Sequence, residues 1–250
     1  MHILARAALT ASLLTALLCP YGSEAAPKPR YESPIRAELE KDMAPRQLMP
    51  HYSEELAYGS IEAEWPRLGL AEADAAAQEF VESSIIDFKG RALQCTAEMA
   101  AMGLKLPSCE LEIKAAVSGN GKTVGLLWLI YEYMGGAHGS VALESRTYSY
   151  EDSRLLALED LFEDPEEALR IASIVTRDQL REKRLPADMY LPGTEPDAYN
   201  FRVFALTESG ISFYFEPYQV GPWAAGSVQT YVPLDVFEDA RPRREYWPEK

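Results

Sequence analysis

Two kinds of hydrophobic periodicity follow one another in the first half of the chain. Residues 53–65 alternate between apolar and polar positions as in a half-buried strand, and Pro66 ends the run. From Leu70 to Phe88, apolar residues recur at three- and four-residue spacing with acidic residues between them. This spacing predicts an amphipathic helix that ends at or near Gly90.

A meander of three strands is predicted next. Residues 111–117 alternate apolar and charged positions, and Gly119-Asn120-Gly121 is typical of a tight turn. Residues 124–133 are apolar almost throughout, which predicts a central strand covered on both faces. A glycine-rich loop at 135–139 leads to a third strand at 141–150. The helix would cover one face of this sheet, as in an α+β layer.

The second half of the chain repeats the combination of one helix and three strands. Asp164-Pro165 is an N-terminal cap with a first-turn proline, and Pro186 stops the helix that it opens. Strands are predicted at residues 201–206, 211–215 and 228–232. The sequence therefore predicts an α+β fold with mixed or antiparallel sheets, each covered by a helix, and with two helices of substantial length. We expect an N-terminal α+β subdomain at 53–130, a C-terminal domain at 131–238 and a loose tail at 239–250.

The first 25 residues have the layout of a secretory signal peptide. Arg6 precedes an apolar run at residues 7–18, and small residues follow up to Ala25. Cys19 is a less favoured lipidation site, because Leu18 stands where a lipobox has a small residue. Residues 26–52 are rich in proline and charge, which predicts a linker or a loosely packed lead-in.

No later segment is long and apolar enough to cross a bilayer, for which roughly 20 residues are needed. We therefore expect a periplasmic or secreted protein without a transmembrane segment. Cys95 and Cys109 would remain after export, and an even count in an oxidising compartment predicts one disulfide. That bond would close a loop of about 15 residues and stabilise the fold by about 3 kcal/mol. We expect no metal site and no cofactor, since these cysteines and the distant histidines make a poor zinc set.

Charge narrows the classes of partner. The chain has a formal net charge of −15, which argues against nucleic-acid binding, because neutralising phosphates needs a basic face. An acidic surface favours encounter with cationic partners. Solubility alone would explain the same charge.

Few residues are candidates for chemistry. His138, in the loop at 135–139, could act as a general base or could simply bond locally in a tight turn. No Gly-x-Ser-x-Gly elbow is present. The carboxylates at 159–167 are better explained by helix capping and solvation than by a glycosidase pair.

A second loop, at residues 216–226, combines prolines, glycines and aromatic residues. Tyr218 and Trp223 are candidate ligand anchors or packed loop residues. Structural roles are expected for the glycines of both loops, which are Gly135, Gly136, Gly139, Gly221 and Gly226.

Several blocks in the right order resemble a domain of unknown function shared by the anti-sigma factor RsiV and the peptidoglycan deacetylase PdaC. The similar region runs from about Tyr131 to Leu234, and residues 53–130 resemble more weakly the domain that often precedes it. The blocks are Tyr131 with Gly135-Gly136-Ala137-His138-Gly139, Leu158-Glu159-Asp160-Leu161-Phe162, Asn200-Phe201, Gly210-Ile211 with Phe213, and Phe215, Tyr218, Val220-Gly221-Pro222, Ala224-Ala225-Gly226 and Val232-Pro233.

This resemblance implies a function in the cell envelope. In RsiV the extracytoplasmic part binds lysozyme, and in PdaC the catalytic zinc site belongs to a separate domain. We therefore expect a non-catalytic binding or sensing protein, with a lysozyme-like cationic protein or peptidoglycan as its ligand. The alternatives are a cell-envelope hydrolase that uses His138 and nearby carboxylates, and a purely structural accessory domain.

Overall fold

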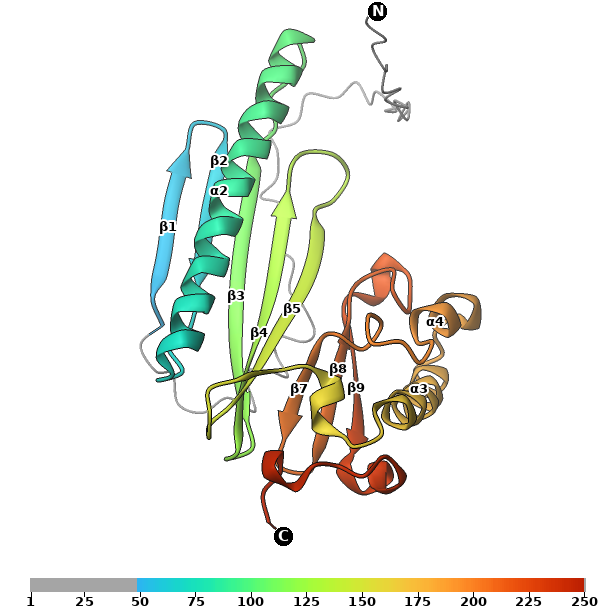
Figure 1. The fold of residues 1–250 in the computed structure, drawn as a ribbon. Helices are drawn as coiled ribbons and strands as arrows, with labels where there is room; N and C mark the ends of the chain where they lie inside the picture. The colour runs from blue at the N-terminus through green and yellow to red at the C-terminus, as the bar shows by residue number, and fades with distance from the viewer. Residues whose placement is uncertain (1–48, 250) are drawn as a thin grey trace, which may run out of the picture. The chain divides into compact units, whose positions relative to one another are not determined.

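The computed structural model describes residues 49–249, which form an α+β fold with two sheets (Figure 1). The larger sheet has six strands in the order of the sequence. They are β1 (His51–Leu56), β2 (Gly59–Glu64), β3 (Cys109–Gly119), β4 (Thr123–Tyr133), β5 (Ser140–Ser149) and β6 (Leu155–Leu156). All neighbours are antiparallel except β2 and β3, which are parallel because α2 (Ala71–Ala101) joins them. The predicted mixed sheet is therefore confirmed.

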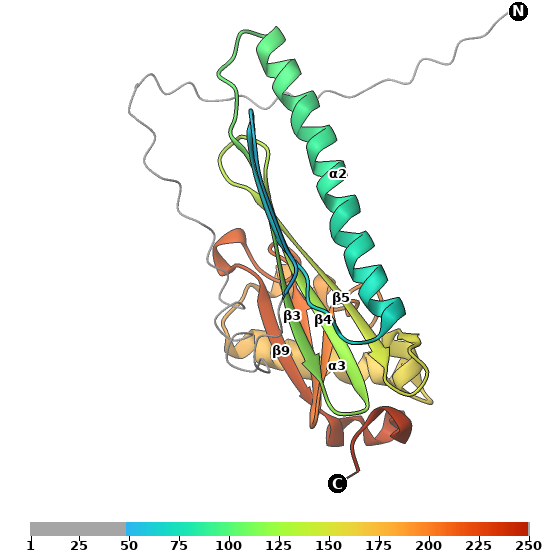
Figure 2. The ribbon, with the colours of Figure 1, turned by 90° about the vertical axis from the view of Figure 1, so that its left-hand side faces the viewer.

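Helix α2 packs along one face of this sheet (Figures 1 and 2). Its buried side chains share one stripe and are mostly small, which lets the helix approach the strands; they are Ala73, Ala77, Val81, Ile85, Phe88 and Ala92. The predicted end at Gly90 is wrong, since the helix continues to Ala101. A glycine inside a helix costs only about 1 kcal/mol relative to alanine, which the packing of α2 outweighs.

The smaller sheet contains β7 (Phe204–Thr207), β8 (Gly210–Phe215) and β9 (Val228–Pro233), all antiparallel. Helix α3 (Pro165–Glu182) covers it and begins as predicted, because Asp164 Oδ1 accepts the Glu167 N–H at 3.1 Å. A short helix, α4 (Ala187–Gly193), follows directly after Pro186 and was not predicted. The expectation of two substantial helices, each on one sheet, is confirmed.

Side chains complete the edges of both sheets. Gln179 of α3 donates to the Tyr231 carbonyl at 2.6 Å and accepts the Tyr231 N–H at 3.0 Å, so it continues the ladder beyond β9. Ser145 Oγ of β5 accepts the Phe204 N–H at 3.0 Å and thereby joins the two sheets. The expected division between residues 130 and 131 lies inside β4, and both β4 and β5 pair within the larger sheet.

The C-terminal residues belong to the core of the smaller sheet. Two 3-10 segments follow β9, η3 (Leu234–Ala240) and η4 (Arg244–Tyr246). Trp247 is only 4% exposed, and Asn120 Nδ2 donates to the Tyr246 carbonyl at 2.8 Å. The expected loose tail at 239–250 is thus wrong, because two aromatic side chains bury their apolar surface there.

The predicted disulfide is absent, since Cys95 and Cys109 are not bonded to each other. Cys95 lies on α2 with its Sγ 3.5 Å from the Met134 carbonyl oxygen. Cys109 begins β3, where it is fully buried and donates its backbone N–H to Tyr58 at 2.7 Å.

Two further expectations change or fall outside the structure. Residues 53–65 do not form one strand, because β1 and β2 form a hairpin that turns between Leu56 and Gly59. The expected signal peptide at 1–25, the possible lipidation of Cys19 and most of the lead-in at 26–52 lie outside the described residues. Within residues 49–249 no helix is long and apolar enough to span a membrane.

Candidate ligand-binding site

The loop between β4 and β5 is shaped by its glycines. Gly135 and Gly136 have φ values of 99° and 102°, which favour glycine, and Tyr133 Oη donates to the Gly136 carbonyl at 3.0 Å. Gly139 lies against the ring of Tyr131, so that a Cβ there would be 2.5 Å from Tyr131 Cε2. This geometry fixes the position of His138 at the end of the loop.

His138 is exposed and stacks on Trp223 from the β8–β9 loop. The two ring centroids are 4.4 Å apart with an interplanar angle of 19°. The Nδ1 atom is 2.8 Å from the Gly139 carbonyl oxygen, to which it donates in the tautomer that carries its proton on Nδ1. The stack therefore joins a loop of the larger sheet to a loop of the smaller one.

The β8–β9 loop is held from within and from outside. Tyr218 has a φ of 73°, unusual for a residue other than glycine, and its N–H donates to the Gly221 carbonyl at 3.0 Å. Gly226 also has positive φ, 66°. Gln219 Nε2 donates to the Asn200 carbonyl at 3.0 Å, which ties the loop to the domain beneath it.

Gly221 completes the packing of this loop. A Cβ at Gly221 would approach Leu185 Cδ2 to 3.2 Å, so the loop backbone lies directly on the side chain that follows α3. The positive φ of Tyr218 is maintained by these contacts. Backbone strain of this kind is often found at ligand-binding sites.

Three aromatic side chains come together here. Tyr218 is 58% exposed, and its ring centroid is 6.0 Å from that of Trp223. We call His138, Tyr218 and Trp223 the aromatic cluster. Each of the three was a candidate on sequence grounds, and only the fold places them side by side.

Two acidic residues lie opposite the tyrosines of β4 that lead into the β4–β5 loop, and sequence reasoning did not select them. Glu110 and Glu112 of β3 pair with Tyr133 and Tyr131 of β4, on the face of the sheet opposite α2. Burial raises the pKa of Tyr131, and the negative charges of Glu110 and Glu112 raise it further. The signal was present in the alternation of β3, which directs its charged residues to one face.

The contacts of His138 do not resemble a catalytic triad. Among the described residues, its ring contacts the Gly139 carbonyl and Trp223, and neither is a nucleophile or a carboxylate. Within the same part of the chain, no group of three or more His, Cys, Asp or Glu residues could hold a metal ion. The arrangement brings three aromatic side chains together without the groups of a catalytic triad.

Family comparison identifies the segment that contains the β8–β9 loop. Residues 159–235 match the model described as "Protein of unknown function (DUF3298)". This segment is therefore similar to the DUF3298 domain. It includes Tyr218 and Trp223, whereas His138 lies in the β4–β5 loop, which precedes the matched segment.

Curated relatives match about half of the chain. Over 121 residues the chain is 30% identical to "Peptidoglycan-N-acetylmuramic acid deacetylase PdaC" of Bacillus subtilis (strain 168), covering 47% of this chain and 26% of that protein. Over 116 residues it is 22% identical to "Immunogenic protein MPT64" of Mycobacterium tuberculosis, covering 46% of this chain and 51% of that protein. The matches thus span about a quarter and about half of these relatives.

Two solved structures of DUF3298 proteins share the fold. BF2082 of Bacteroides fragilis is 19% identical with a TM-score of 0.55, covering 77% of this chain and 91% of that one. PA4972 of Pseudomonas aeruginosa PAO1 is 14% identical with a TM-score of 0.54, covering 85% of this chain and 100% of that one. These coverages extend beyond the DUF3298 domain, so the likeness includes part of the preceding sheet.

Proposed function

We propose that this protein is a binding or sensing protein of the cell envelope, secreted or periplasmic, that contacts its ligand through the aromatic cluster. The stacking of His138 on Trp223 carries the proposal, because it joins an exposed histidine and a half-buried tryptophan from two separate loops, next to the exposed Tyr218. Exposed loop aromatics are frequent anchors of interfaces. The similarity to a peptidoglycan deacetylase supports the location in the envelope.

The ligand favoured by the charges is a cationic protein, for which a lysozyme-like muramidase is the candidate implied by the resemblance to RsiV. The net charge of −15 would steer such a protein toward this one. Glu110 of β3 lies opposite Tyr133, at the end of β4 that leads into the loop of His138, and aromatic faces attract Lys and Arg side chains. Peptidoglycan itself is the second ligand to be tested.

Binding of c-type lysozyme and of soluble peptidoglycan fragments to the purified protein tests the proposal. We expect Tyr218→Ala and Trp223→Ala each to weaken binding by about tenfold or more. Tyr150→Ala is the matched control, since Tyr150 is exposed at the opposite end of β5. If the ligand is cationic, affinity falls as salt is raised. Retention of neither ligand at low salt, or equal weakening by all three variants, would contradict the proposal.

Two substitutions of His138 separate binding from the hydrolase alternative. His138→Phe keeps a planar ring for Trp223 and removes the imidazole, whereas His138→Ala removes the stack as well. A binding role requires that the His138→Phe variant retain its affinity for the ligand and that the His138→Ala variant lose it. A hydrolase with His138 as its general base would lose turnover of peptidoglycan in both variants.

A further inference from the structure

The outer edge of β1 is open. Among the described residues β1 pairs only with β2, and it lies at the outside of the larger sheet (Figure 1). The Pro50 carbonyl accepts the Trp65 N–H at 3.2 Å, so alternate residues from Pro50 onward bond to β2. The backbone N–H and C=O groups of His51, Ser53 and Glu55 therefore point away from the sheet, and no described residue bonds to them.

Side chains bond to the outer edges of β5, β7 and β9. Glu216 Oε1 accepts a backbone N–H of β5, Ser145 Oγ accepts one of β7, and Gln179 bonds to β9. An open edge is a template for pairing with another chain, and proteins commonly blunt it with lysine, proline or a bulge. β1 has none of these, because its sequence is His-Tyr-Ser-Glu-Glu-Leu and its register with β2 is continuous.

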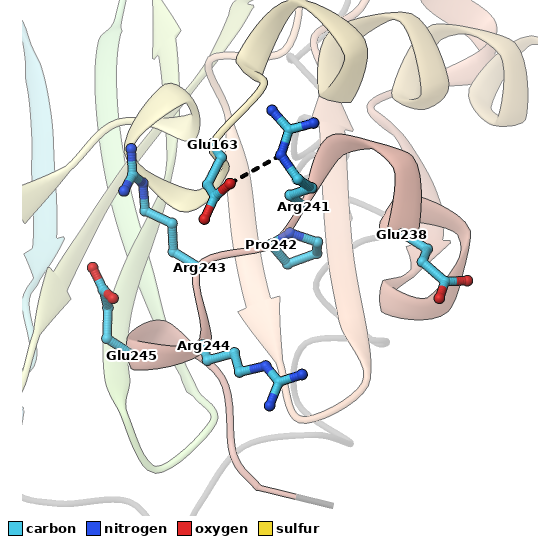
Figure 3. A pocket seen from close by; sticks show the side chains of 7 residues that line it. All are labelled: Glu163, Glu238, Arg241, Pro242, Arg243, Arg244 and Glu245. Atoms are coloured by element: carbon cyan, nitrogen blue, oxygen red, sulfur yellow. Dashed lines mark hydrogen bonds and ion pairs between the residues drawn. The ribbon is translucent and has the colours of Figure 1, made fainter.

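The extended chain before α3 also has a partner. Pro242 of the C-terminal segment forms a β-bridge with Phe162, and the Glu163 N–H donates to the Arg241 carbonyl at 3.0 Å. The side chains of Glu163 and Arg241 form an ion pair at 2.9 Å, which Figure 3 shows as a dashed line. The outer edge of β1 differs from these segments in having no bonded partner among residues 49–249.

An apolar flank of α2 lies on the same side as the open edge. Lys89 of α2 donates to Tyr52 Oη at 3.0 Å and forms an ion pair with Glu54, so this flank of the helix faces β1. Ile86 and Leu93 are three residues before and four residues after Lys89, which places them on the same flank. Their side chains are 68% and 59% exposed. A chain that paired with β1 would therefore lie next to uncovered apolar side chains.

We propose that β1 pairs with β1 of a second copy of this protein, in an antiparallel, two-fold symmetric register centred on Ser53. In this register the outward backbone groups of the two strands meet, His51 lies opposite Glu55, and Tyr52 lies opposite Glu54. Centring the pair on Glu54 or Glu55 instead would place like charges directly opposite each other, which destabilises a strand pair. The side chains of β1 are thus complementary to those of a second β1, as a two-fold interface requires.

The same two-fold axis turns the apolar flanks of the two α2 helices toward each other. Lys89 contacts the side chains on both sides of Ser53, so it lies at the level of the axis. Ile86 and Leu93 lie on either side of that level, and the axis directs Ile86 of one copy toward Leu93 of the other. Burial of these side chains adds apolar area to the backbone pairing. The interface does not involve the aromatic cluster and does not depend on its function.

Sedimentation equilibrium of the purified protein from about 1 µM to about 1 mM tests the pairing. We expect a monomer–dimer equilibrium that shifts toward the dimer as salt is raised, because salt screens the repulsion between two chains of net charge −15. Binding of a cationic ligand to the aromatic cluster has the opposite salt dependence, so the two proposals can fail separately. A monomer throughout this range would overturn the pairing.

Two substitutions of Ser53 place the interface at β1. Ser53→Pro removes the outward N–H and no bond to β2, whereas Ser53→Ala keeps that N–H; both remove the bond from Ser53 Oγ to Glu62. We expect Ser53→Pro to weaken the dimer at least about tenfold and Ser53→Ala to retain it. Equal dimerisation of the two variants would refute the pairing.

Substitution on α2 gives a test that leaves the strand intact. Leu93→Glu is expected to weaken the dimer at least about tenfold, because the charge would enter the apolar contact between the helices. Ile174→Glu is the matched control, since Ile174 is 47% exposed on α3. Urea unfolding shows whether each variant remains folded. If Ser53→Pro is not folded, an equal effect of Leu93→Glu and Ile174→Glu is sufficient to refute the pairing.

Amide hydrogen exchange identifies what covers the edge. The N–H groups of Ser53 and Glu55 should exchange more slowly as the protein concentration rises into the dimeric range. Protection that does not depend on concentration would mean that another segment of the same chain covers β1. Unprotected amides in the dimer would place the interface elsewhere. Either result would overturn the proposal.

Discussion

Substitution of Gln179 tests whether its side chain stabilises the exposed edge of the smaller sheet. Its amide group makes both hydrogen bonds that a further strand would make to Tyr231 of β9, at 2.6 and 3.0 Å. Gln179→Met keeps the length of the side chain and removes both bonds. The Tyr231 N–H and carbonyl would then lose their partners at a partly buried position.

The expected loss is the sum of two backbone groups left without partners. At about 1 kcal/mol for each group, Gln179→Met lowers the free energy of unfolding by about 2 kcal/mol. For a protein of this size, 1 kcal/mol corresponds to roughly 2–4 °C, so the melting temperature is expected to fall by about 4–8 °C. Urea unfolding, monitored by fluorescence, measures the free energy of unfolding, and calorimetry measures the melting temperature independently.

The control is Gln94→Met, because Gln94 is exposed on α2 and bonds only to Glu98 of the same helix. It should change stability by less than about 0.5 kcal/mol. If Gln179→Met changed stability no more than Gln94→Met does, Gln179 would not act as the partner of β9, and the reasoning would be wrong.

Gln179→Glu adds a test by pH. A neutral carboxyl group can replace the amide, donating its O–H to the Tyr231 carbonyl and accepting the Tyr231 N–H. An ionised carboxylate would oppose the carbonyl oxygen, so folding raises the pKa of this glutamate. The variant should therefore approach wild-type stability below the unfolded pKa of about 4.3 and lose it as pH rises through the folded pKa. Parallel stability curves for the variant and the wild type would exclude this mechanism.

Three further predictions concern other parts of the fold. Gly139→Ala forces a Cβ against Tyr131 and should destabilise the protein by about 1–3 kcal/mol in urea unfolding, with weaker ligand binding. Trp247→Ala should cost about 3–5 kcal/mol by the same assay, and Trp247→Phe less, because the indole N–H has no partner. Hydrogen bonds from Lys89 and Tyr52 lower the pKa of Glu54 in the folded protein. The stabilisation from these bonds is therefore present above the ordinary glutamate pKa and is lost as pH falls through the lowered pKa of the folded state. Lys89→Met should make the stability of the protein less dependent on pH in this acidic range.

Hydrophobic patterns, turn residues and helix caps within a few residues were sufficient to predict some of the strands and helices. The alternation of β3, the apolar run of β4 and the turn between them predicted the meander, and the Asp164-Pro165 cap predicted the start of α3. These signals lie within a few residues and do not depend on distant contacts.

Other elements depend on contacts that a linear pattern does not contain. Leu56, Ala57 and Tyr58 are consecutive apolar residues, so the β1–β2 turn was not recognised from the local pattern. Gly90 is tolerated because the opposite side of α2 is packed. Trp247 follows a short 3-10 segment without periodicity, so its burial could not be read from spacing. The even cysteine count and the expected export predicted a disulfide, but a bond also needs the two side chains to face each other.

The aromatic cluster shows why the candidate site could be predicted only residue by residue. Composition marked each loop separately, since glycines and aromatics were concentrated in both. The stack of His138 on Trp223 exists only because Ser145 of β5 bonds the backbone of β7 and Glu216 Oε1 accepts the Leu143 N–H at 2.9 Å, which hold the two sheets together. The DUF3298 segment alone supplies Tyr218 and Trp223 without His138. A function assigned from that segment by itself would therefore leave out part of the proposed site, and ligand binding has to be measured on a protein that contains both sheets.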